Sequence, residues 1–73
     1  MNNDKLFELY VTLHEYSYEA DIAKAKELMI KIIDILGYDY NVNNCNIYVI
    51  NHFIKQCKRR AIAKIYKLML SSV

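Results

Sequence analysis

The sequence predicts an all-α protein, a small three-helix domain with a long basic C-terminal helix. It contains no proline and one glycine, so residues that break helices are almost absent. Apolar residues recur at intervals of three and four, which is typical of one face of a helix and not of a strand. A chain of 73 residues is long enough for one domain. We therefore expect helices at about 3–16, 18–36 and 44–70 in a single domain, 1–73.

The first predicted helix has a clear start and a regular apolar face. Asn2 or Asn3 can cap it, and the carboxylate of Asp4 suits the positive end of the helix dipole. Its apolar face comprises Leu6, Leu9, Leu13 and Tyr16.

A break is expected between the first and second helices. Steps of seven from Leu6 reach Ala20, whereas the next apolar series begins at Ile22, so the two series are out of phase. Ser17 can cap the second helix, and Asp21 suits its start. The alternative is one continuous helix over 4–36, because no residue there forbids it.

The second predicted helix ends at Gly37, since glycine readily adopts the left-handed conformation that closes helices. Residues 28–36 are apolar except for Lys31 and Asp34. A helix of this kind is buried on more than one side, so we expect it to be the central element. Its apolar series is Ile22, Ala25, Met29, Ile32 and Leu36.

The third predicted helix follows the loop 38–44, where Asn43 or Asn44 can act as its cap. A helix from there to Leu70 is roughly 40 Å long, so we expect its C-terminal end to project beyond its partners. Its apolar residues occupy a sector of about 80° on a helical wheel. They are Ile47, Ile50, Ile54, Cys57, Ala61, Ile65 and Leu68.

Charge divides the chain into two unlike parts. Residues 41–73 contain six basic residues and no acidic one, whereas residues 1–40 contain four lysines and all eight acids, a formal charge of −4. A surface of one sign attracts ligands of the opposite sign. The helical wheel places the cations in two groups beside the apolar sector. The candidate binding residues for a protein partner or nucleic acid are Lys55, Lys58, Arg59, Arg60, Lys64, Lys67 and Tyr66.

The sequence contains no CxxC or HExxH motif. His52 and Cys57 are five residues apart, so they do not share a helix face as paired metal ligands do. Cys57 lies in the apolar series, where a cysteine acts as a small hydrophobic residue, and Cys45 lies nearer a helix start. We expect no enzymatic activity, no catalytic residues, no metal and no cofactor.

Apolar residues make up 55% of the chain, above the usual ~45–50%. A small globule has too little interior for that fraction, so we expect self-association, most simply as a homodimer. The alternative is that seven tyrosines, which tolerate half-burial, inflate the count.

The expected location is intracellular and cytoplasmic, in a host cell if the source is a virus or phage. The start of the chain lacks the basic flank and apolar run of a signal peptide. The apolar run 28–36 is too short to span a bilayer. If both cysteines lie on one helix they are roughly 18 Å apart, too far for an intramolecular disulfide.

Four interpretations of the basic helix compete. Its cations can form a solvated face that pairs with the chain's own Glu8, Glu15 or Glu27. They can also meet an acidic protein, nucleic acid phosphates in a largely sequence-independent way, or a membrane surface, which ranks last because tryptophan is absent. We favour a small non-enzymatic interaction protein, an adaptor or inhibitor of viral, phage or cellular origin. The alternative is a nucleic-acid-binding regulator that uses residues 55–67.

Overall fold

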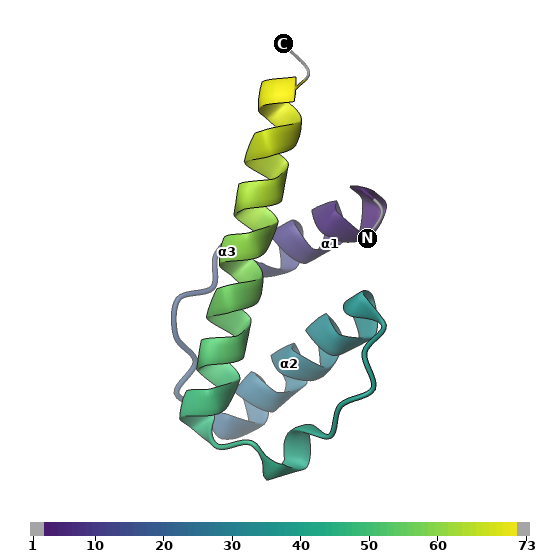
Figure 1. The fold of residues 1–73 in the computed structure, drawn as a ribbon. Helices are drawn as coiled ribbons and strands as arrows, with labels where there is room; N and C mark the ends of the chain where they lie inside the picture. Colours follow the sequence, from purple (N-terminus) through teal and green to yellow (C-terminus); the bar gives the residue numbers. More distant parts are fainter. Residues whose placement is uncertain (1–2, 72–73) are drawn as a thin grey trace.

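Three α-helices and one short 3-10 helix make up the computed structural model, which describes residues 3–71. The elements are α1 (Asn3–Leu13), α2 (Ile22–Leu36), η1 (Val42–Asn44) and α3 (Ile47–Ser71). Figure 1 shows α1 and α2 side by side, with the long α3 crossing both. The predicted all-α fold with three helices is confirmed. No helix within residues 3–71 has both the length and the apolarity required to cross a membrane.

The first helix, α1, is shorter than predicted. It buries the expected leucine series but ends at Leu13, whereas residue 16 was the predicted end. A tight turn follows, in which the Tyr16 amide donates to the Leu13 carbonyl at 2.9 Å. This turn directs the Tyr16 side chain to a partner on α3, and that contact replaces another helical turn. The predicted cap Asn2 lies outside the described residues.

A linker over residues 14–21 separates α1 from α2, so the predicted break is confirmed and the continuous helix is wrong. Asp21, and not Ser17, is the N-cap of α2. Its carboxylate accepts hydrogen bonds from the amides of Ala23 at 3.0 Å and Lys24 at 3.4 Å. An acceptor here satisfies amides that have no partner inside the helix. Ser17 is exposed within the linker.

The predicted end of α2 at Gly37 is confirmed. Gly37 has φ 73° and ψ 27°, and the Tyr38 amide donates to the Ile33 carbonyl at 3.0 Å, which closes the helix. The expectation that α2 is the central element is wrong: Ile30 in its apolar run is exposed, and α3 is the helix that packs against both others. The buried residues of α2 are Ala25, Met29, Ile32, Ile33 and Ile35.

Asparagines organise the connection from α2 to α3, but not the two that were predicted. Asn41 caps η1, its side chain accepting from the Asn43 amide at 3.0 Å. Asn46 precedes α3, and its side-chain oxygen accepts from the Val49 amide at 2.9 Å. The predicted caps Asn43 and Asn44 are therefore wrong, because η1 occupies those positions and delays the start of α3 to Ile47.

The apolar face of α3 is the central element of the core, since both other helices pack against it. Ile50, Ile54 and Ala61 are buried, and the remaining members of the predicted series are half-buried. The radius of gyration is 12.8 Å, whereas a compact domain of this length has about 11 Å. Figure 1 shows the cause, because the C-terminal part of α3, in yellow, extends beyond α1. The predicted projection is confirmed.

Candidate interaction surface

The six cations of α3 lie in two flanks beside its buried face. The first basic flank is Lys55, Lys58 and Arg59, and the second is Arg60, Lys64 and Lys67. All are exposed except the half-buried Lys58. Within residues 3–71, none of the six forms an ion pair with a carboxylate. Pairing with the chain's own Glu8, Glu15 or Glu27 is therefore not what positions these cations.

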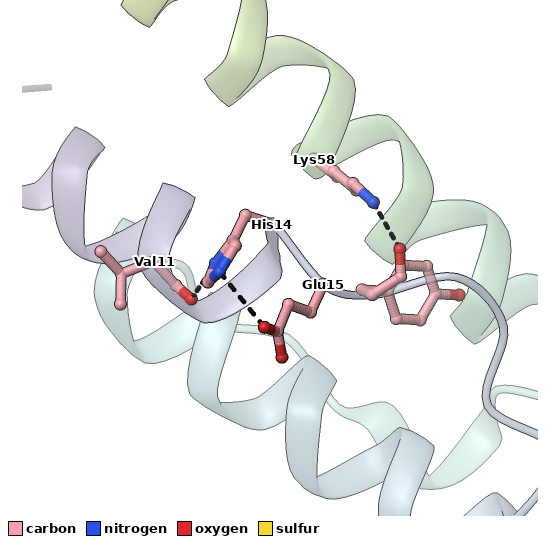
Figure 2. Close-up of polar contacts among 5 residues, drawn as sticks. Val11, His14, Glu15 and Lys58 are labelled. Atoms are coloured by element: carbon pink, nitrogen blue, oxygen red, sulfur yellow. Dashed lines mark hydrogen bonds and ion pairs between the residues drawn. The ribbon is translucent and has the colours of Figure 1, made fainter.

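The first basic flank borders a shallow hollow between α3 and the linker. The Lys58 ammonium donates a hydrogen bond to the Tyr16 carbonyl. Without this bond, the carbonyl would have to be hydrated. Figure 2 shows the Lys58 side chain reaching from α3 toward the linker, which also carries His14 and Glu15. Lys58 therefore has a structural role that sequence reasoning did not anticipate. The hollow is lined by Tyr16, Ser17, Lys55, Lys58, Arg59 and Ile62.

A buried amide, Asn51, joins α3 to the same linker. Its side chain is 6% exposed. Its oxygen accepts from the Glu19 amide at 2.9 Å and from the Tyr16 hydroxyl, and its nitrogen donates to the Glu19 carbonyl at 3.0 Å and the Ile47 carbonyl at 2.9 Å. Burial is the main reason that the pKa of Tyr16 is raised, with Tyr18 and Glu19 adding to it. Sequence reasoning missed Asn51, although its position beside the apolar sector of α3 was a usable signal.

The second basic flank borders an apolar hollow at the mouth of the core. The apolar part of the hollow is lined by Leu6, Leu9, Leu36, Phe53 and Cys57. Arg60 and Lys64 of the second basic flank lie at its rim. Burial raises the pKa of the Cys57 thiol, and the nearby Arg60 offsets this only in part. The thiol is therefore protonated at neutral pH, and so it is a poor nucleophile. Cys45 lies elsewhere, with its sulfur 3.8 Å from the Tyr40 hydroxyl.

The projecting end of α3 carries an exposed apolar strip, which we call the α3 stripe. Tyr66 is 61% exposed and Leu70 is 60% exposed. The members follow the spacing i, i+4, i+7 and i+8, so they share one side of the helix. They lie on the same side as the first basic flank and continue it toward the C-terminus. The α3 stripe consists of Ile62, Tyr66, Met69 and Leu70.

A second exposed apolar pair lies on α1. Phe7 and Val11 are 49% and 65% exposed, and they point away from the buried leucines. The exposed carboxylates Asp4 and Glu8 share this side of the helix. We call these four residues the α1 outer face. Sequence reasoning missed it, although apolar residues at i and i+4 opposite a regular core series were visible.

Exposed tyrosines occur in the loop after α2 and on α3. Tyr38 and Tyr40 are exposed in that loop, and on α3 Tyr66 is 61% exposed and Tyr48 is 74% exposed. Both lie on α3 where α1 and α2 do not cover it, so the helix offers them nothing to pack on. Tyr66 consequently remains a candidate contact residue.

No cluster of three or more potential metal ligands exists within residues 3–71. Comparison with protein-family models, with curated proteins and with solved structures finds no match to this chain. We therefore infer function from the chain's own surfaces.

Proposed function

We propose that this protein is a small, non-enzymatic, intracellular interaction module that self-associates and binds a protein partner through the exposed C-terminal part of α3. The α3 stripe is the observation that carries this proposal. Complete burial of one large apolar side chain is worth about 1.5–3 kcal/mol, so burying several of them at a contact is strongly favourable. Adaptors and inhibitors, including those encoded by viruses and phages, act in this way without catalytic groups.

The surroundings of the α3 stripe support a contact with another protein. Aromatic residues, methionine and arginine are enriched at protein interfaces, and Tyr66, Met69 and Arg59 lie together on this side of α3. The C-terminal part of α3 extends beyond α1 (Figure 1), and the stripe residues are exposed. Positive charge beside the stripe favours a partner surface that is apolar and acidic.

Sedimentation velocity over a range of about 5–500 µM tests this proposal, because weak complexes dissociate within that range. The wild-type sedimentation coefficient should rise with concentration, whereas Tyr66→Ser and Leu70→Ser should lower the association at least about tenfold. Tyr48→Ser is the matched control, since it removes a more exposed tyrosine of α3 that lies outside the stripe. A wild-type chain that stays monomeric throughout, or equal losses in all three variants, would contradict the proposal.

A nucleic-acid-binding regulator is the second candidate function, supported by six α3 cations that form no ion pair within residues 3–71. The two basic flanks face different sides of α3, so one duplex can contact about three cations. The logarithm of the binding constant should then fall with the logarithm of salt concentration with a slope near −3.

Fluorescence anisotropy with a labelled duplex measures this slope. Replacing Arg60, Lys64 and Lys67 by glutamine should flatten it if the second basic flank binds, and replacing Lys55 and Arg59 should do so if the first flank binds. Lys24→Gln, an exposed lysine on α2, is the control. Absence of binding at low salt would exclude this function.

A further inference from the structure

We propose that the α3 stripe of one copy packs against the α1 outer face of a second copy. This inference rests on the proposed function, because it names the partner of the surface described above. A single chain carries both halves of the contact, and their six apolar side chains are exposed to between 42% at Ile62 and 65% at Val11.

The two faces match in kind and in length. From Ile62 to Leu70 the α3 stripe is about 12 Å long, and from Asp4 to Val11 the α1 outer face is about 10 Å long. Each presents large apolar side chains at helical spacing, so the two can interdigitate as packed helices do. Phe7 supplies a ring and Val11 a branched side chain, against a tyrosine, a methionine and two aliphatic residues on α3.

Charge selects this pairing over its main competitor, a contact between two α3 stripes. Residues 41–73 contain no acid, so a contact between two stripes brings cationic helices together. The α1 outer face instead brings Asp4 and Glu8 toward Arg59, which lies on the same side of α3 as the stripe. Opposite charges across a contact favour association and fix its orientation. The two modes therefore respond oppositely to salt, since screening weakens attraction and relieves repulsion.

The inference predicts a specific pattern of complementation. Disruption of the α1 outer face by Phe7→Ser with Val11→Ser should abolish self-association, and so should disruption of the stripe by Tyr66→Ser with Leu70→Ser. An equimolar mixture of the two variants should associate again, because each supplies the face that the other lacks. A contact between two α3 stripes cannot be restored by mixing, because the stripe variant has no intact stripe to contribute.

Sedimentation velocity of each variant and of the mixture, at about 50 mM and 300 mM salt, provides the test. Wild-type association should weaken several-fold at the higher salt, and Glu8→Lys should weaken it at least about threefold at the lower. At a concentration low enough for the wild type to be monomeric, thermal unfolding followed by circular dichroism should match the wild type in every variant, since all the altered side chains are exposed.

The outcomes separate this inference from the function on which it rests. If the stripe variant is monomeric while the α1 variant still associates, the stripe pairs with another surface; the inference is then wrong and the proposed function stands. Association that strengthens with salt, or a mixture that stays monomeric, also overturns the inference. A wild-type chain that is monomeric at all concentrations overturns both.

Discussion

Replacing Asn51 by alanine should destabilise the fold more than any other single polar change on α3. The substitution removes the side-chain oxygen, which accepts from the Tyr16 hydroxyl and the Glu19 amide. It also removes the side-chain nitrogen, which donates to the carbonyls of Glu19 and Ile47. The bond to Ile47 costs little to lose, because that carbonyl lies within α3. The three others hold the linker against the helix.

The magnitude follows from those three bonds. Each contributes about 0.5–1.5 kcal/mol net, and a buried group left without a partner costs about 1–3 kcal/mol. Glu19 is half-exposed, so water can reach part of the linker once the amide is gone. We expect Asn51→Ala to lower the free energy of unfolding by about 2–4 kcal/mol, a large part of what a domain of this size possesses.

Urea unfolding followed by circular dichroism measures this loss. The concentration should be low, so that self-association adds nothing to the stability. His52→Ala is the matched control, because His52 is the adjacent, exposed residue and should change the stability by less than about 0.5 kcal/mol. An Asn51→Ala variant as stable as this control would refute the assignment of the linker contact to Asn51.

A double-mutant cycle measures how much of this loss of stability comes from the hydrogen bond between Asn51 and the Tyr16 hydroxyl. Tyr16→Phe removes the hydroxyl alone and should cost about 1 kcal/mol. Because both variants lose the same hydrogen bond, the double variant should lose less than the sum of the two. Strict additivity would show that the hydroxyl and the amide do not depend on each other.

Two further predictions concern Cys57 and Gly37. The pKa of the Cys57 thiol is raised in the folded state, so folding favours the protonated thiol. The free energy of unfolding should therefore be constant below the thiol's usual pKa of about 8.5 and should fall as the pH rises beyond it. Cys57→Ala should remove this pH-dependent part of the stability. Iodoacetamide should accordingly modify Cys57 in the folded protein at neutral pH more slowly than in the urea-unfolded protein, as peptide mass spectrometry can measure. Gly37→Ala should cost about 1 kcal/mol in urea unfolding, since φ is 73° and no atom lies within 4 Å of an added Cβ, so the cost is in the backbone. An unchanged midpoint would contradict this reasoning.

Local chemistry explains which parts of the fold could be predicted from the sequence. The helices, the glycine at the end of α2 and the apolar sector of α3 depend on spacing and on single residues, so they were accessible. The end of α1 was not, because Tyr16 continues the apolar series and only its contact with Asn51 on α3 shows why the helix stops. The start of α3 depends on which of several asparagines act as caps, and all of them have the necessary chemistry.

The candidate surface likewise has features that could be predicted from the sequence and features that could not. Charge and helical spacing identified the two basic flanks, because both are properties of one helix. Burial of Lys58 against the linker and exposure of Tyr48 depend on which parts of α3 the rest of the chain covers. The α1 outer face was not predicted, because Phe7 and Val11 lie outside the leucine series that forms the core.

The charge split along the chain is better explained by contacts between molecules than by stability within one. An exposed ion pair contributes only about 0.2–1 kcal/mol, so folding gains little by bringing the acids of α1 and α2 to the cations of α3. Within residues 3–71 the fold leaves those six cations without an acidic partner, and Asp4 and Glu8 remain exposed on α1. Opposite charges that folding does not bring together stay available to orient an encounter and to exclude partners of the wrong sign. We therefore infer that the acid-free segment and the acidic first half act across an interface, where an apolar stripe supplies affinity and charge determines which face it meets.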